Sequence, residues 1–357
     1  MKTSLNSLHN KLSIKTPALL KPIKKRDEAR KPTKNFSKMF QSLIPRKSSL
    51  ILFLQQKTKG ISTENGLLRF FVLTMLILNM PQHVEGQGQN IGQSYSELSP
   101  LAHHKTALEV LAASKKWINQ FNEGNALECA NGYDKDAAMR ATPFGTKKGF
   151  DEISGFWLDL VDKGASNLVY ENVKIEVVDE KLAFLSADWR MNIGRGIIYM
   201  EKWEKSNGRW LLTNDDFEML EQFKMPEENS IKSTASHEVL EKVIRTSMEW
   251  INGFNSQQAK ICGSGYTPDA NLSPYPFELV TGQEGIYQFW DGLIKNGARN
   301  LIYNNPVFEA FGKDRAMISS NWSMNIGEGK IFQEKWVLNE NKWLLEYDDF
   351  RVLKSYQ

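Results

Sequence analysis

The sequence predicts two tandem α+β domains, each with three helices packed on a curled antiparallel sheet, behind a different N-terminal segment. A shift of 133 positions places residues 117–217 on 250–350 without a gap, and 43 of the 101 aligned pairs are identical. Within each copy, apolar residues recur first at three- and four-residue steps and then at every second residue, which indicates helices followed by strands. The repeated unit is longer than the roughly 20–50 residues of a solenoid repeat and has the size of a whole domain.

The N-terminal segment differs from the rest of the chain in charge. The formal net charge of the chain is +3, but residues 1–65 hold 15 Lys and Arg and only three acids, so the remainder is acidic. Residues 1–65 are rich in Lys, Ser and Pro and lack sustained apolar periodicity, which predicts a disordered basic leader. Such a tail can contact nucleic acid or anionic lipid, or serve as a solvated or cleaved leader. No nucleic-acid partner is expected for the folded part.

An apolar segment at 66–86 follows the leader. Its core, Phe70–Met80, is too short to span a bilayer, which needs about 20 apolar residues. It matches the apolar region of a secretory signal, about 7–15 residues long after basic residues, with residues 84–86 (Val-Glu-Gly) as the cleavage site. We therefore expect an exported protein, periplasmic or secreted, with a membrane anchor or a cytoplasmic location as alternatives. Because such signals normally begin a chain, either the true start codon lies downstream of Met1 or the leader is unusually long.

Polar segments separate the two domains from each other and from the N-terminal part. Residues 87–104 are predicted to be a linker to the first domain, 105–222. Residues 223–236 are predicted to link it to the second domain, 237–357.

The first copy is predicted to begin with an amphipathic helix that stops at residues 122–124 (Asn-Glu-Gly). Its apolar face is predicted to hold Leu108, Leu111, Ala112, Trp117, Ile118 and Phe121. A short second helix is expected around 126–131, followed by an extended segment at 133–141. A third helix is expected after Gly149, with Gly164 as its C-terminal cap.

Four strands complete each copy, in the first at about 167–179, 182–193, 196–205 and 209–220. The last two are joined by Asn207-Gly208, a strong hairpin signal. Helices packed on one face of an antiparallel sheet form an α+β domain.

Cysteine and histidine usage gives no sign of a metal or a disulfide. Cys129 and Cys262 occupy equivalent positions of the two copies, and matching points on two domains need not be close. Their predicted role is that of small buried residues. The histidines are scattered without zinc-ligand spacing, and the Gly-x-Gly at 194–196 lacks the strand-to-helix context of a dinucleotide loop. We therefore expect no metal and no cofactor.

Alternation along the last strands predicts carboxyl groups in an aromatic interior. Tyr199 and Glu201 would share the inward face of one strand, and Asp216 the inward face of the next, with Glu334 and Asp349 as counterparts. An ionised carboxylate in apolar surroundings is costly unless paired, and burial raises its pKa. Glu201 and Glu334 are therefore the first candidates for catalytic acid/base residues. The alternative for the glutamates is a structural salt bridge, and for Asp216 a carboxylate that accepts backbone N–H groups.

The first copy contains a set of short motifs: Asn-x-Gly in the first loop, Tyr-x-x-Asp-Ala, Pro-Phe-Gly, Gly-x-x-x-Ile-x-x-Phe-Trp and a terminal Gly-x-Trp-x-Leu-x-x-Asp-x-Phe. With these motifs each copy resembles a domain of the nuclear-transport-factor-2-like superfamily, which includes the SnoaL-like polyketide cyclases and ketosteroid isomerase. The resemblance covers 105–222 and 237–354. It implies a cone-shaped barrel with a pocket for a small hydrophobic molecule in each copy. It does not specify an activity, because this fold serves isomerases, cyclases, dehydratases and binding proteins.

Ketosteroid isomerase provides a test, because it uses an Asp base, a Tyr phenol and a protonated Asp. The phenol, base and acid positions fall in the two copies on Trp117 and Trp250, on Thr142 and Tyr275, and on Glu201 and Glu334. Two of the three groups are thus missing from both copies, which argues against steroid isomerisation by this mechanism.

The resemblance also implies a lining for each pocket, although these aromatic residues are equally typical of a core. The predicted lining of the first copy is Trp117, Trp157, Trp189, Met191, Tyr199, Trp203 and Asp216. That of the second copy is Trp250, Tyr275, Trp290, Trp322, Met324, Phe332, Trp336 and Asp349.

Two classes of function remain open. The first is a SnoaL-like enzyme, a cofactor-independent isomerase or lyase that acts on a small apolar carbonyl compound through Glu201 and Glu334. The second is a non-catalytic module that binds a ligand or serves for pairing.

Members of the superfamily commonly dimerise through the open face of the sheet. We therefore expect the two copies to pair as an internal pseudo-dimer, with the polar residues of 186–192 and 319–325 near the contact. Further homo-oligomerisation is left open.

Overall fold

The computed structural model describes residues 99–226 and 231–356. The predicted leader at 1–65, the apolar segment at 66–86 and the linker up to residue 98 lie outside these residues, and so do residues 227–230 of the second linker. In the described ranges, no helix has both the length and the apolar character that a membrane crossing requires.

The first copy has the predicted order of helices and strands. Its helices are α3 (Ala102–Asn122), α4 (Ala126–Ala130) and α5 (Gly149–Asp162), and its strands are β1 (Tyr133–Thr142), β2 (Gly145–Lys148), β3 (Val169–Val177), β4 (Leu182–Met191), β5 (Gly194–Ser206) and β6 (Arg209–Gln222).

The second copy repeats this order. Its helices are α6 (Ala235–Asn255), α7 (Ala259–Ser264) and α8 (Gln283–Lys295), and its strands are β7 (Tyr266–Tyr275), β8 (Val280–Thr281), β9 (Ile302–Phe311), β10 (Arg315–Met324), β11 (Gly327–Asn339) and β12 (Lys342–Ser355).

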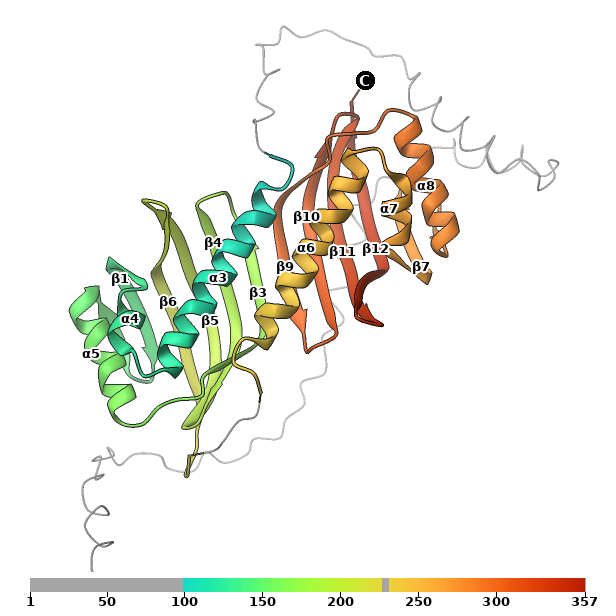
Figure 1. Ribbon diagram of the computed structural model, residues 1–357. Helices are drawn as coiled ribbons and strands as arrows, with labels where there is room; N and C mark the ends of the chain where they lie inside the picture. Colours follow the sequence, from blue (N-terminus) through green and yellow to red (C-terminus); the bar gives the residue numbers. More distant parts are fainter. Residues whose placement is uncertain (1–98, 227–230, 357) are drawn as a thin grey trace, which may run out of the picture. The chain divides into compact units, whose positions relative to one another are not determined.

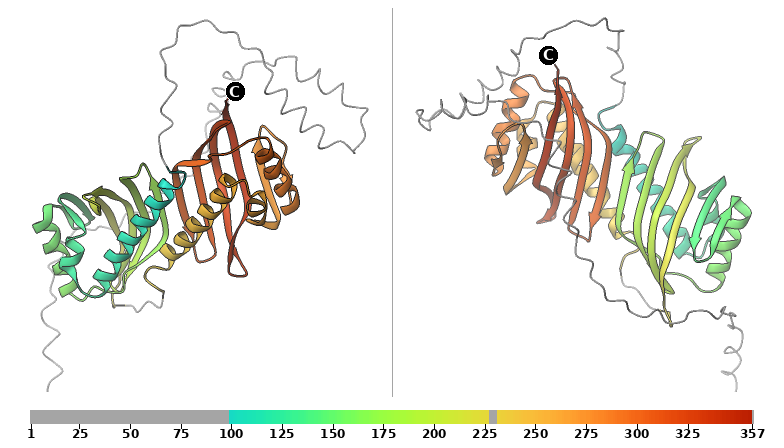
Figure 2. Two further views of the ribbon diagram at one scale, coloured as in Figure 1. Left: turned by 45° about the horizontal axis from the view of Figure 1, so that its top comes forward. Right: turned by 180° about the vertical axis from the view of Figure 1, so that it is seen from behind.

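All twelve strands belong to one mixed sheet in the order β2-β1-β6-β5-β4-β3-β9-β10-β11-β12-β7-β8. The helices cover one face of this sheet, and α3 and α6 lie side by side over its centre (Figures 1 and 2). The prediction of a purely antiparallel sheet was wrong, because β1 pairs with β6 in parallel and β7 pairs with β12 in parallel. The predicted extended segment at 133–141 is thus a full member of the sheet.

Local sequence explains why these elements form where they do. Helix α3 buries Leu111, Ile118 and Phe121 completely or nearly so against the sheet, on the apolar face that the periodicity predicts. The hairpin between β5 and β6 turns at Asn207 and Gly208, whose φ angles of 50° and 78° are those of a type I′ turn.

The two copies are joined at the middle of the sheet. Strands β3 and β9 pair in antiparallel fashion, with Ile175 opposite Phe308. Directly over this pair, His104 of α3 forms a hydrogen bond of 3.1 Å with Ser247 of α6, and Ser114 of α3 forms one of 3.0 Å with His237 of α6. His104 and His237 are equivalent positions in the repeat, and so are the two serines, so the contact is reciprocal.

The contact residues differ from those expected from the sequence. Residues 186–192 and 319–325 were predicted to lie at the contact, but Asp188 and Asn321 are exposed on strands β4 and β10. The reason is that the copies meet through the edges of β3 and β9 and through their helices, so this part of the sheet is not the contact face.

Bulges in β5 and β6, and in the equivalent strands β11 and β12, shift the alternation of side chains. In β5, Ile198 pairs with Phe217 and Met200 with Asp216, so that Tyr199 is the extra residue. In β6, the pairing skips Thr213. A bulge moves every later side chain to the opposite face relative to strict alternation. Phe332 and Glu346 are the corresponding extra residues of the second copy.

Strand β5 requires a glycine at position 196, because its backbone there runs very close to β6. A Cβ atom added at Gly196 would lie 1.8 Å from the Glu218 carbonyl oxygen and 2.8 Å from the Trp189 ring. At Gly329 the equivalent distance to the Arg351 carbonyl oxygen is 1.9 Å. The tryptophan ring therefore packs directly on glycine backbone in both copies.

We predict that Gly196→Ala lowers the free energy of unfolding by about 2 kcal/mol or more, because the added methyl group forces the β5–β6 backbone apart. Gly155→Ala on the exposed side of α5 is the control, since a Cβ there meets no atom within 4 Å. That change should stabilise the protein by up to about 1 kcal/mol through helix propensity. Urea denaturation of both variants measures the difference, and an equal effect of the two changes would contradict the packing argument.

We also predict that the histidine contact makes the protein sensitive to acid. Burial lowers the pKa of His104 and of His237 from 6.5 to about 3. Their contribution to stability is therefore complete above pH 6.5 and falls as the pH drops toward 3, by about 1.4 kcal/mol per pH unit for each histidine. The test compares unfolding free energies of the wild type and a His104→Gln/His237→Gln variant between pH 7 and pH 4.5. The gap between them should shrink with acidification, and a gap independent of pH would show that these histidines do not titrate on unfolding.

Candidate functional site

Glu201, the first catalytic candidate, is buried on β5 with both carboxyl oxygens occupied. The Tyr170 hydroxyl donates to Oε1 at 2.9 Å, and the Trp203 indole N–H donates to Oε2 at 2.9 Å. The side chain is 3% exposed. In the part of the chain that the structure describes, Glu201 has no cationic partner, so the predicted alternative of a structural salt bridge was wrong.

A second carboxyl group lies beside the first. Asp215 is 4% exposed and stands directly opposite Glu201 in the β5–β6 register. The hydroxyl group of Tyr133 donates to its Oδ2 atom at 2.6 Å. Two carboxyl groups and two tyrosines therefore form one buried cluster that spans β1, β3, β5 and β6.

The second copy contains the same cluster. Tyr303 and Trp336 donate to Glu334 at 2.5 and 3.1 Å. Tyr266 donates to Asp348 at 2.7 Å. In this copy Asp348 Oδ1 is buried without a hydrogen-bond partner.

Burial sets the protonation of these groups. Burial first, and then the charge of Asp215, raise the pKa of Glu201, although its two hydrogen-bond donors oppose the shift. Burial likewise raises the pKa of Asp215 against the effect of Tyr133. Each pair therefore retains protons at pH values where exposed carboxyls are ionised. The stability that comes from the neutral forms is present at low pH and is lost as the pH rises past the ordinary carboxyl range.

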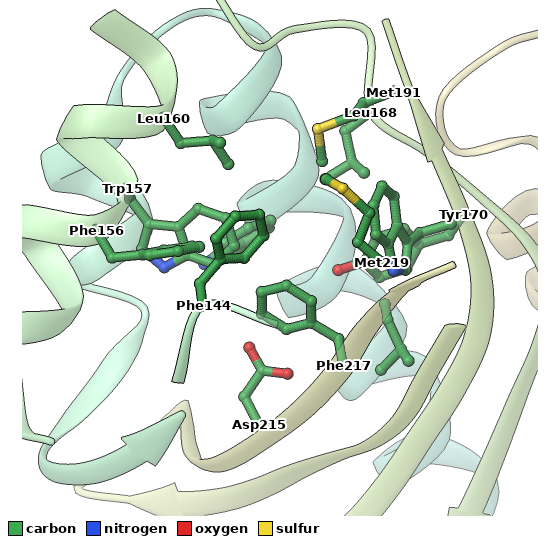
Figure 3. A pocket seen from close by; sticks show the side chains of 13 residues that line it. Phe144, Phe156, Trp157, Leu160, Leu168, Tyr170, Met191, Asp215, Phe217 and Met219 are labelled. Atoms are coloured by element: carbon green, nitrogen blue, oxygen red, sulfur yellow. The ribbon is translucent and has the colours of Figure 1, made fainter. Parts of the chain in front are cut away.

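A cavity of about 30 Å³ reaches this cluster in the first copy. Figure 3 shows the Asp215 carboxyl pointing to the side on which the rings of Phe144 and Phe217 lie. Apart from indole nitrogens, Asp215 and Tyr170 contribute the polar atoms of the lining. The full lining is Trp117, Phe144, Phe156, Trp157, Leu160, Leu168, Tyr170, Trp189, Met191, Ile198, Asp215, Phe217 and Met219.

Four of the predicted lining residues of the first copy border this cavity, namely Trp117, Trp157, Trp189 and Met191. Glu201 and Trp203 do not border the cavity. They lie behind Tyr170, whose hydroxyl donates to Glu201, and the Trp203 indole N–H donates to the same carboxyl group.

Tyr199 and Asp216 were wrongly predicted to face the pocket. Tyr199 is 49% exposed and donates to Glu218, because it is the extra residue of the β5 bulge. Asp216 lies on the other side of β6 and accepts two hydrogen bonds from Arg140. The bulge at Thr213 exchanges the faces of the two adjacent aspartates and turns Asp215 inward.

The two corresponding predictions for the second copy, Phe332 and Asp349 as pocket residues, were wrong for the same reason. Phe332 is 41% exposed as the extra residue of its bulge, and Asp349 is only half-buried, whereas Asp348 is buried. Tyr275 is 61% exposed and shares the guanidinium group of Arg351 with Phe332.

The remaining predicted lining residues of the second copy lie in or near its core. Trp290 packs edge-on against Trp250 at 5.0 Å and is stacked on Phe350 at 5.8 Å. Its indole N–H donates to Tyr266 at 3.2 Å. The core also includes Trp322 and Trp336, while Met324 is half-buried.

Sequence reasoning missed the tyrosines and the inner aspartates. One signal was present, because Tyr133 and Asp215 are 82 residues apart and so are Tyr266 and Asp348. Both residues of this pair are identical in the two copies, as expected if each pair forms the same buried hydrogen bond. The cysteines behave as expected: Cys129 and Cys262 are free and buried, and each carbonyl oxygen accepts a hydrogen bond from the indole of Trp117 or Trp250.

Comparison with known proteins gives structural similarity only. No protein-family model and no curated protein matches the chain. Solved structures that resemble it include a candidate scytalone dehydratase from Novosphingobium aromaticivorans (12% identity, 35% of this chain, 91% of that chain, TM-score 0.32). Others are an NTF2-like protein with a cystatin-like fold from the same organism (11%, 33%, 83%, 0.28) and a cystatin-like fold protein of unknown function from Nostoc punctiforme (13%, 31%, 88%, 0.28). Each alignment covers about a third of this chain.

We predict that Tyr133→Phe lowers the free energy of unfolding by about 1–3 kcal/mol, because Asp215 loses its buried donor. The loss should be larger at pH 9 than at pH 5, since the ionised carboxylate depends on that donor more than the neutral acid does. Tyr199→Phe is the matched control, because it removes an exposed tyrosine–carboxyl bond and should change stability little. Denaturation of both variants at the two pH values measures these effects, and a loss from Tyr133→Phe that is the same at both pH values would refute the role of the ionised form.

Proposed function

We propose that the first copy binds a small apolar molecule that carries one hydrogen-bonding oxygen, and that Asp215 meets this oxygen. The observation that carries the proposal is the cavity, whose lining is apolar and largely aromatic but includes the polar side chains of Asp215 and Tyr170. Small-molecule sites in proteins typically combine an apolar pocket with a few polar groups that orient the ligand.

The size of the cavity limits the ligand. A volume of about 30 Å³ holds about two water molecules. Phe144 lines the cavity and is 44% exposed, so rotation of its ring would open the space toward solvent. Met219 is another lining residue, and the flexible methionine side chain adapts readily to a new neighbour. A ligand larger than a few heavy atoms therefore requires these two side chains to move.

Proton transfer is the chemistry that this site would support. A carboxyl group whose pKa is raised toward neutrality suits a general acid or base. Asp215 borders the cavity, whereas Glu201 already accepts two hydrogen bonds. We therefore assign to Asp215 the acid/base role that the sequence suggested for Glu201. Isomerase-, cyclase- or dehydratase-type reactions without a cofactor are the corresponding reaction classes.

We further propose that each copy is a cone-shaped barrel of the NTF2-like kind and that the two form an internal pseudo-dimer. The reciprocal hydrogen bonds His104–Ser247 and Ser114–His237 support this relation, because an isologous interface pairs the same positions from both sides.

A second candidate function is a non-catalytic pairing module, and the second copy favours it. There the carboxyl cluster is intact, but Asp348 Oδ1 is enclosed and Trp290 donates to Tyr266. In this interpretation the second copy supports the first and does not bind a ligand through Asp348.

We predict that a small neutral carbonyl compound, cyclopentanone, shifts the indole N–H signals of Trp157 and Trp189 in a saturable manner in NMR titrations. Both indoles line the cavity and have unpaired N–H groups, so they report on its occupation. Ile198→Phe should abolish the shifts by filling the cavity. Ile331→Phe, the equivalent change in the second copy, is the control and should preserve them. Saturable shifts that survive Ile198→Phe would place binding elsewhere, and their absence from the wild type would refute the proposal for this class of ligand.

A further inference from the structure

In each copy, the tyrosine that holds the buried glutamate packs against a histidine of the other copy. Tyr170 donates to Glu201 at 2.9 Å. The ring of Tyr170 lies 6.0 Å from that of His237, at an angle of 34° between the planes. His237 belongs to α6, the first helix of the second copy, and its side chain is completely buried. A residue of the second copy thus contacts the cluster of the first.

The position of His237 is itself fixed from the first copy. Ser114 on α3 holds its Nε2 atom at 3.0 Å. The segment that leads into α6 adds contacts to β3, because the Tyr170 backbone N–H donates to the Ser233 carbonyl and the Val173 N–H donates to Ser236 Oγ, both at 3.3 Å. The strand that carries Tyr170 is therefore held by the second copy through both backbone and side-chain contacts.

The same arrangement occurs with the copies exchanged. His104 of the first copy forms its hydrogen bond with Ser247, and its ring lies 5.6 Å from that of Tyr303. Tyr303 donates to Glu334 at 2.5 Å. Two symmetric series of contacts therefore connect the copies, each from the first helix of one copy to the buried glutamate of the other.

The first of these series also reaches the cavity. Tyr170 lines it and stands opposite Trp189, another lining residue, in the β3–β4 register. If His237 did not cover the ring of Tyr170, water would have access to that face of the ring and the side chain would gain rotational freedom. Its hydroxyl would then no longer be held on Glu201, and one wall of the cavity would lose its fixed position.

We propose that His237 is a positioning residue for the cavity of the first copy, and His104 for the carboxyl cluster of the second, so that the cavity and the cluster are complete only when the two copies are joined. This inference rests on the proposed function for what the cavity binds. The contact across the junction can be tested without a ligand.

The test uses the full chain and two reporters. The indole N–H signal of Trp189 reports on Tyr170, and that of Trp322 reports on Tyr303, because each tryptophan stands opposite its tyrosine across two strands. His237→Leu should shift the Trp189 signal more than the Trp322 signal. His104→Leu should do the reverse. This crossed pattern is the distinguishing result, since a general loss of stability would move both reporters together.

The carboxyl groups supply a second readout. In a carbon-13 NMR titration, His237→Leu should raise the midpoint of Glu201, in the same direction as Tyr170→Phe and by a smaller amount, because the Tyr170 bond favours the ionised form. The Glu334 midpoint should stay in place. His237→Phe retains a ring beside Tyr170 and should restore the Glu201 midpoint toward the wild-type value. If His237→Leu fails to fold, Ser114→Ala removes only the hydrogen bond to His237 and should cause a smaller shift of the same signals.

A crossed pattern in both the indole signals and the glutamate midpoints supports the inference. Equal shifts of Trp189 and Trp322, or shifts confined to the copy that carries the mutation, would overturn it. Cyclopentanone separates this result from the proposed function: weaker binding in His237→Leu but unchanged binding in His104→Leu supports the link to the cavity. Absence of binding to the wild type would contradict the proposed function and leave the crossed pattern to be judged by itself.

Discussion

The interior of each copy depends on hydrogen bonds from tyrosine hydroxyls to buried carboxyl groups, which form no ion pair within residues 99–226 and 231–356. Moving a carboxylate from water into an apolar interior costs several kcal/mol. A tyrosine reduces this cost without introducing an opposite charge, because it is itself largely apolar and brings one donor. Asp215 has Tyr133 for this purpose, and Glu201 has Tyr170 together with an indole N–H. These bonds connect β1 to β6 and β3 to β5, in addition to the backbone pairing of the sheet.

Much of the fold could be predicted because the repeat and the periodicity are strong signals. The helices lie within a few residues of their predicted ends, and the Asn207-Gly208 hairpin forms where that dipeptide indicates it. The parallel pairing of β1 was missed for a different reason: an extended segment carries no local mark of its partner or its direction. Pairing of this kind is set by tertiary structure, which alternation along a single strand does not record.

The site was harder to predict because one extra residue reverses the face of every side chain that follows. Two adjacent aspartates end the sequence motif of the last strand, and strict alternation selects Asp216. The bulge at Thr213 selects Asp215 instead and places Asp216 beside Arg140. No residue type marks this bulge in the sequence, since neither glycine nor proline occurs there. The cross-copy role of the histidines was hidden for a related reason, because His104 and Ser247 are 143 residues apart and meet only through the contact of α3 with α6.

The pairing of β3 with β9 leaves neither strand at an edge of the sheet. In a single copy, β3 would be the edge of a sheet and would present unpaired backbone N–H and C=O groups to any other extended chain, which is a common route to aggregation. Joining two copies turns both edges into the centre of one sheet. The strands left at the outside of the described sheet, β2 and β8, have only four and two residues, and strands this short offer little for a neighbouring molecule to extend. The duplication thus removes two long unpaired strand edges as well as doubling the domain.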